Sequence, residues 1–141
     1  MLKALVPVDG SSASERAVRH VIALAKGRAG MEVHLVNVQE GADAPELKRF
    51  MKESEIKRAQ LAHGAAAMVA AKRLLDRARL KYQEHVLIGD PAEQIARFAK
   101  RRGIDKIVMG THGRSGLSAL LMGSVATKVL HHATVPVTLV K

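Results

Sequence analysis

Short apolar runs alternate with helical patterns along the whole chain. The runs that resemble strands are Leu2–Val8, Glu32–Val38, Tyr82–Ile88, Asp105–Met109 and Val135–Val140. The first is almost continuously apolar, which is typical of a parallel strand covered on both faces. Five strands alternating with helices predict an α/β fold, with a parallel sheet between two helical layers.

Apolar residues at helical spacing predict a first helix over Ala13–Ala25. Ser11 or Ser12 can cap this helix, and Glu15 follows Ser12 at the spacing of a capping box. Gly27 and Gly30 mark its end.

A helix-rich segment with a strongly basic face runs from Pro45, which suits a first helical turn, to about Arg79. It is long for one globular helix, so either Gly64 interrupts it or its first turns form a separate short helix. Asp90 and Pro91 suit the start of the next helix, and Gly103 its end. The last helix is expected from about Ser118 or Gly123 to His132.

Composition limits the classes of function. The 141 residues, 48% of them apolar, fit one domain over residues 1–141. The absence of cysteine excludes disulfides, thiolate catalysis and Cys-ligated zinc, and is compatible with the cytoplasm. No signal-peptide or membrane-span pattern is evident. The net charge of +10 favours polyanionic partners, but 2% aromatic residues leave no platform for stacking single-stranded nucleic acid.

A glycine-rich segment follows the fourth strand, with the spacing Gly110-x2-Gly113-x9-Gly123-Ser124. Glycines let the backbone approach a phosphate, and a helix N-terminus attracts anions. Ser124 can add a hydroxyl there. Ligands of parallel sheets bind at the carboxyl ends of strands, so Asp9 would flank the same crevice if strands one and four are neighbours. A purely structural turn is the alternative.

Four segments together resemble the universal stress protein family, and the resemblance covers the whole chain. They are Val6–Ser11, Leu35–Val38, Gly89–Pro91 and Met109–Gly116. The glycine spacing is similar to that of the family's ATP-binding branch. The resemblance implies a Rossmann-like fold of the adenine nucleotide alpha hydrolase type, with five parallel strands in the order 3-2-1-4-5.

The resemblance also implies a nucleotide site. Asp9 would meet the ribose or the adenine edge, and the backbone of Val38 would read the adenine. The pocket would be lined by Pro7 and Val8 and closed by Met109. The ribose and phosphates would be approached by Gly110 and Gly113 and bound by Gly123, Ser124 and Val125, with Arg114 as a candidate phosphate partner.

The function implied by the resemblance is that of a cytoplasmic stress protein in which ATP, with Mg²⁺, acts mainly as a regulatory ligand. Bound ATP would order the Gly110–Gly123 loop and change the surface seen by an unknown protein partner. The strand Val135–Val140 would be an apolar edge strand, through which the family commonly forms homodimers.

Two other functions remain open. One is slow ATP hydrolysis or autophosphorylation on Ser124 or another loop hydroxyl, although no general base is evident. The other is a basic interaction module, using the face of residues 48–81, that needs no nucleotide. A P-loop motif is absent. Adjacent His131 and His132 point apart on a helix and are poorly placed to hold one metal ion, and we expect His112 to be exposed.

Overall fold

The computed structural model describes residues 1–28, 30–41, 45–111 and 122–141. Within them lies a five-stranded parallel sheet of order β3-β2-β1-β4-β5, as the family resemblance implies. The strands are β1 (Leu2–Pro7), β2 (Met31–Gln39), β3 (Tyr82–Ile88), β4 (Lys106–Gly110) and β5 (Val137–Val140). The helices are α1 (Ser12–Ala25), α2 (Pro45–Phe50), α3 (Glu53–Ala67), α4 (Val69–Arg77), α5 (Pro91–Arg101) and α6 (Ser124–His132).

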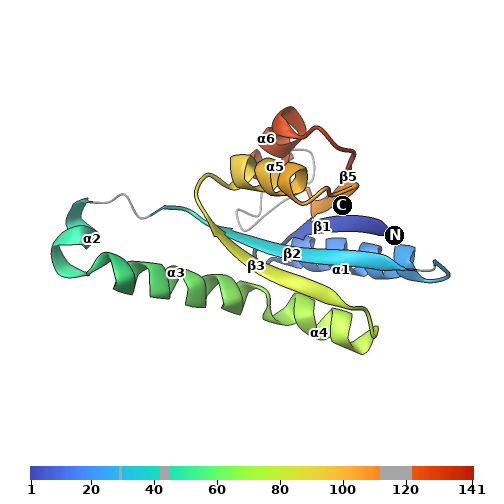
Figure 1. Cartoon of the computed structure of the whole chain (residues 1–141), viewed down its shortest axis with the longest axis horizontal. Helices are drawn as coiled ribbons and strands as arrows, with labels where there is room; N and C mark the ends of the chain where they lie inside the picture. Colours follow the sequence, from blue (N-terminus) through green and yellow to red (C-terminus); the bar gives the residue numbers. More distant parts are fainter. Residues whose placement is uncertain (29, 42–44, 112–121) are drawn as a thin grey trace.

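Helices cover both faces of the sheet (Figure 1). Leu5 and Val36 face α5 and α6, where they pack with residues such as Phe98. Their neighbours Val6 and Leu35 face the opposite layer and pack with residues of α1 and α4. Because successive side chains of a strand point to opposite faces, a strand covered on both sides reads as a continuous apolar run.

The predicted elements occur with small differences in their bounds. The start of β5 is the largest difference among the strands, at Val137 rather than Val135. Proline has no backbone N–H, so Pro136 contributes only its carbonyl, which accepts from the amide of Ile107 at 2.9 Å. Ser11 caps α1 and accepts from the amide of Ser14 at 3.2 Å. Ser14 thus occupies the third helical position, and the Ser12–Glu15 capping box is not formed.

Residues 45–77 form three helices rather than one. Of the two alternatives, the separate first helix is confirmed by α2. An interruption at Gly64 is wrong, because α3 continues through Gly64 to Ala67. The break falls at Met68, which is buried and whose amide bonds back to the carbonyl of Ala65 at 3.2 Å. A Cβ atom added at Gly64 would lie 2.5 Å from Val86, so this glycine serves close packing of α3 on the sheet.

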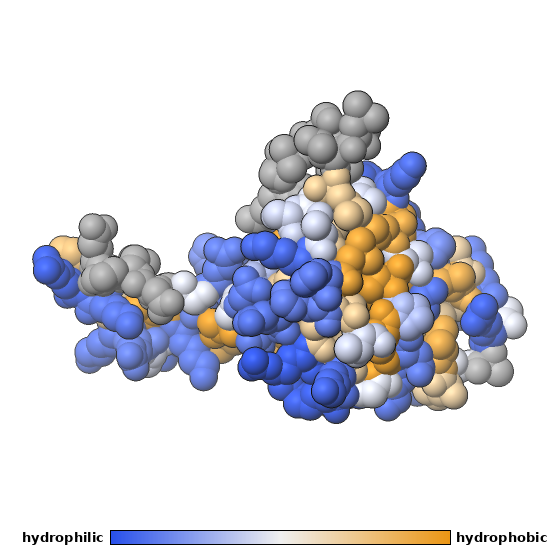
Figure 2. Space-filling view, turned by 90° about the horizontal axis from the view of Figure 1, so that it is seen from above, coloured by the Kyte–Doolittle hydropathy of each residue, from blue (hydrophilic) through white to orange (hydrophobic). Residues whose placement is uncertain are grey.

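We call residues 45–63 the arm. It extends away from the sheet in Figure 1, and Figure 2 shows a mostly hydrophilic surface at the same end of the molecule. The side chain of Phe50 is 86% exposed, and Gly64, just beyond the arm, is the buried residue of α3. The arm therefore adds little to the core. None of the helices in the described ranges is long and apolar enough to span a membrane.

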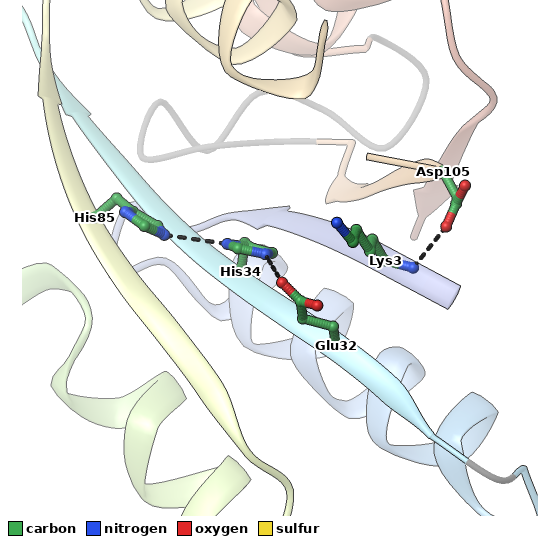
Figure 3. Close-up of polar contacts among 5 residues, drawn as sticks. All are labelled: Lys3, Glu32, His34, His85 and Asp105. Carbon is green, nitrogen blue, oxygen red and sulfur yellow. Dashed lines mark hydrogen bonds and ion pairs between the residues drawn. The ribbon is translucent and has the colours of Figure 1, made fainter. Parts of the chain in front are cut away.

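A polar cluster lies between β2, β3 and α5 (Figure 3). His34, 2% exposed, is hydrogen-bonded to His85 through Nδ1 at 3.1 Å and to Glu32 through Nε2 at 2.7 Å. The rings of His34 and His85 stack at a centroid distance of 5.3 Å, and the ring of Phe98 lies 4.7 Å from that of His85. This pair could not be predicted from the sequence, because its members are 51 residues apart.

Candidate functional site: a pocket at the carboxyl ends of β1, β2 and β4

A pocket of about 300 Å³ opens where β1, β2 and β4 end. The N-terminal turns of three helices also contribute to its wall, through Ser11 and Ser14 of α1, Pro91 and Ile95 of α5, and residues 123–126 of α6. Helix N-termini carry partial positive charge and backbone N–H groups without intrahelical partners. The apolar side chains and these polar groups together suit a small ligand that combines a flat apolar part with an anionic part.

Asp9 follows β1 at the mouth of the pocket. Its Oδ1 accepts from the amide of Ser11 at 2.9 Å, and its own amide donates to Oγ of Ser14 at 3.4 Å. The intervening Gly10 has φ of +84°, a conformation that glycine adopts without steric cost. The turn between β1 and α1 therefore fixes the Asp9 carboxylate beside the pocket.

The end of β2 forms a second wall. The amide of Val8 donates to the carbonyl of Val36 at 2.8 Å, which extends the pairing of β1 with β2 beyond Pro7. Asn37, only 4% exposed, donates through Nδ2 to the carbonyl of Val8 at 2.8 Å. Val38 is partly buried against the core and lines the pocket.

Gly110 ends β4 and lies against the first turn of α1. A Cβ atom at Gly110 would lie 2.8 Å from the backbone carbon and oxygen of Ala13. Gly110 is not among the residues with positive φ. The structure thus gives this glycine a packing reason, the close approach of β4 to α1.

Thr111, which follows β4, and Gly123, which precedes α6, are bonded to each other at the pocket. The amide of Thr111 donates to the carbonyl of Val140, and the amide of Gly123 donates to the carbonyl of Thr111. Gly123 is the N-cap of α6, and its carbonyl accepts from the amide and the hydroxyl of Thr127, both at 3.0 Å. These bonds hold the first turn of α6, with Ser124 and Val125, at the pocket.

The structure brings most of the residues predicted for the site to this one pocket. Its lining includes Pro7, Val8, Asp9, Val38, Met109, Gly110, Gly123, Ser124 and Val125. Strands β1 and β4 are neighbours, as the shared crevice requires. The predicted residues Gly113 and Arg114 lie outside the described residues, as does His112.

The pocket also has lining residues that the sequence analysis did not assign to it: Ser11, Ser14, Val36, Asn37, Pro91, Ile95, Thr111 and Ala126. The sequence did contain an indication for Asn37, because it is a polar residue within the apolar run of β2, just before the strand ends. Ile95 had none, because its helical spacing is that of any core residue and only the packing of α5 brings it here.

Comparisons with known proteins agree with this geometry. The family model described as the universal stress protein family matches residues 1–141. Universal stress protein MJ0531 of Methanocaldococcus jannaschii is 33% identical over 141 residues, which cover 99% of this chain and 81% of that protein. The solved structure of protein MJ0577 from the same organism has a TM-score of 0.85 at 32% identity, covering 99% of this chain and 95% of that chain.

A further solved structure was determined with a ligand. The universal stress protein of Archaeoglobus fulgidus in complex with dAMP has a TM-score of 0.71 at 25% identity, covering 100% of this chain and 98% of that chain. The full-length family match, the sequence relatives and the fold agree with one another. The chain belongs to the universal stress protein family.

Proposed function

We propose that the pocket binds an adenine nucleotide, and that this nucleotide is ATP, accompanied by Mg²⁺. The observation that carries the proposal is the gathering of nine predicted site residues, from four separate segments of the chain, around one pocket. The relative from Archaeoglobus fulgidus, which was solved with dAMP, supports an adenine nucleotide as the ligand.

The chemistry of the lining suits each part of a nucleotide. Val38, Met109 and Ile95 offer apolar contact to a base. The Asp9 carboxylate can accept hydrogen bonds from ribose hydroxyls, since an ionised carboxylate acts as an acceptor. The amides of Ser124 and Val125 belong to a helix N-terminus, which favours phosphate groups. Mg²⁺ is usually bound through substrate phosphates, with few protein ligands.

In this proposal the nucleotide is a regulatory ligand of a cytoplasmic stress protein. The first turn of α6 is joined to the end of β4 through the bond between Gly123 and Thr111. Phosphates bound at this helix would therefore also act on the segment between Gly110 and Gly123. A protein partner would then distinguish occupied from empty protein by the surface of that segment.

We also propose a homodimer formed through the segment Val135–Val140. Strand β5 is at the edge of the sheet, and its residues are partly exposed. Figure 2 shows hydrophobic residues gathered in a patch on the side of the molecule where α5, α6 and β5 lie. An apolar edge strand with open backbone groups favours pairing with a second copy.

Calorimetric titration with ATP, AMP and GTP, in the presence of Mg²⁺, tests the nucleotide proposal. Asp9→Asn keeps an oxygen that can accept from the Ser11 amide but removes the charge and replaces the other carboxylate oxygen, the proposed acceptor for ribose hydroxyls, with an amide donor. We expect it to weaken ATP binding about tenfold or more, because hydrogen bonds to charged groups contribute about 1.5–3 kcal/mol. Chromatography of the nucleotide after incubation reports any turnover.

Asp105→Asn is the matched control, because it makes the same charge change at the amino ends of the strands, away from the pocket at their carboxyl ends. There Asp105 accepts from the backbone amide of Lys3 at 2.7 Å (Figure 3). This variant should bind ATP as the wild type does. Equal affinities of the wild type and Asp9→Asn, or no binding by the wild type, would contradict the proposal.

A further inference from the structure

Asn37 is a buried polar side chain in the wall of the pocket, with 4% of its surface exposed. It is flanked in β2 by Val36 and Val38, and an apolar side chain there would continue the pattern of the strand. Burying an amide is unfavourable unless its hydrogen bonds are made. What Asn37 bonds to therefore indicates what it does.

The Asn37 side chain continues the hydrogen bonding between β1 and β2 beyond the point where their backbone pairing ends. The register of these two strands runs to Pro7 and Val36, and one further bond joins the Val8 amide to the Val36 carbonyl. The Val8 carbonyl is then bonded by Nδ2 of Asn37 at 2.8 Å. Both backbone polar groups of Val8 are thus fixed, immediately before Asp9.

Two groups agree on the orientation of the Asn37 amide. The Val8 carbonyl can only accept, so Nδ2 of Asn37 faces it, and Nε2 of Gln39 donates to Oδ1 of Asn37 at 2.6 Å. A reversed amide would place two oxygens together at Val8 and two nitrogens together at Gln39. Gln39 is not among the residues that line the pocket, and its bond to Oδ1 adds to the preference that the Val8 carbonyl imposes on Asn37.

We propose that Asn37 is a positioning residue of the nucleotide pocket, which holds the Val8 carbonyl so that Asp9 meets the ligand, and that the bond from Gln39 supports its orientation. This inference rests on the proposed function, because the ligand is the proposed nucleotide. Asn37 acts through the backbone of Val8 and Asp9, and it differs from a core residue of the same size in supplying a donor.

Asn37→Asp preserves size and shape but replaces the donor facing Val8 with an oxygen. At pH 7.5 we expect ATP to bind about tenfold more weakly or worse, because the carboxylate oxygen that replaces Nδ2 would face the Val8 carbonyl oxygen with no donor between them. As the pH falls and the carboxyl takes up a proton, its O–H can donate to Val8. The ratio of variant to wild-type dissociation constants should therefore approach one between pH 7.5 and 5, which a loss of packing would not produce.

A second pair of variants tests the role of Gln39 without changing the pocket lining. Gln39→Glu replaces the donor with an acceptor, so it favours the reversed amide of Asn37 and should weaken ATP binding severalfold. Gln39→Met, the matched control, removes the bond without favouring reversal and should stay closer to the wild type. Thermal unfolding and circular dichroism verify that each variant is folded.

The inference is overturned if folded Asn37→Asp binds ATP as the wild type does at every pH, or if its loss of affinity is independent of pH. Equal affinities of Gln39→Glu and Gln39→Met would remove the role of Gln39. If the wild type binds no nucleotide, the proposed function fails. The positioning role of Asn37 is then tested separately by amide hydrogen exchange. Exchange at Asp9, Gly10 and Ser11 should be faster in Asn37→Asp, with the amides of α5 unchanged, and equal exchange would refute the positioning role.

Discussion

Gly110 touches the backbone of α1 at Ala13, where nearly any side chain would collide. We expect Gly110→Ala to lower the free energy of unfolding by about 1–3 kcal/mol, the usual cost of overpacking. The added Cβ would lie 2.8 Å from backbone atoms, which cannot rotate away as a side chain does. Urea denaturation measures the change.

Gly41→Ala is the control for this substitution, since an added Cβ there meets nothing within 4 Å. It should change the stability by less than about 0.5 kcal/mol, as surface substitutions usually do. If both variants are equally stable, the contact between β4 and α1 is looser than the structure indicates.

His85 makes the stability depend on pH. Its burial lowers its pKa below the ordinary value of about 6.5, and the charges of His34, Arg102 and Arg101 lower it further against a smaller opposite effect of Glu84. The unfolded chain therefore binds the proton more readily than the folded one. The contribution of His85 is fully present above about pH 6.5 and decreases as the pH falls below that value.

We expect His85→Gln to reduce the loss of stability between pH 7.5 and 5.5, because an amide can still bond to His34 but does not titrate. Urea denaturation of the wild type and the variant at both pH values measures the difference. Identical losses in the two proteins would show that His85 is not responsible for the pH dependence.

At the level of single residues, the sequence predicted the site where a role follows from position in the chain. Asp9 and the glycine-rich segment that starts at Gly110 were assigned to one crevice because the carboxyl ends of strands meet at one edge of a parallel sheet. Met109 was implied by the family resemblance. Ile95 could not be assigned, because only the packing of α5 brings it to the pocket. Asn37 is conspicuous as a polar residue in an apolar strand, but its bond to the Val8 carbonyl, 29 residues away in the chain, could not be read from the sequence.

At the level of elements, α3 rests on the sheet through Gly64. Replacing glycine by alanine inside a helix usually stabilises it by about 0.5–1 kcal/mol. We predict the opposite for Gly64→Ala, because its Cβ would lie 2.5 Å and 2.8 Å from the two methyl groups of Val86. Urea denaturation should give a lower free energy of unfolding, and a stabilised variant would contradict the packing of α3 on β3.

Gly64 also shows why the helix boundaries in residues 45–77 could not be predicted. Read locally, a glycine in a long helical pattern suggests an interruption. In the structure Gly64 instead allows α3 to pack closely on Val86, which lies 22 residues later in the chain. The strands were predicted more closely, because their apolar runs reflect burial on two faces and end at recognisable turns.

At the level of the whole molecule, the proposed dimer predicts a mass of twice 15.2 kDa in solution. Thr138→Lys should lower the mass toward that of the monomer, because in a twofold pairing of β5 the two lysines would lie close together, and an edge lysine opposes strand pairing. Thr134→Lys, in the exposed turn before β5, is the control. Light scattering after size-exclusion chromatography measures both, and a wild-type monomer would refute the dimer.

The most direct test of the account is to follow the backbone amides by ¹⁵N–¹H NMR while ATP and Mg²⁺ are added. We predict saturable shifts at the pocket, including Val8, Asp9, Asn37, Val38, Ser124 and Val125, with little change in α4. Shifts confined to the basic helices of residues 48–81 would instead support a polyanion-binding surface, and no shifts at millimolar ATP would contradict a nucleotide site in this pocket.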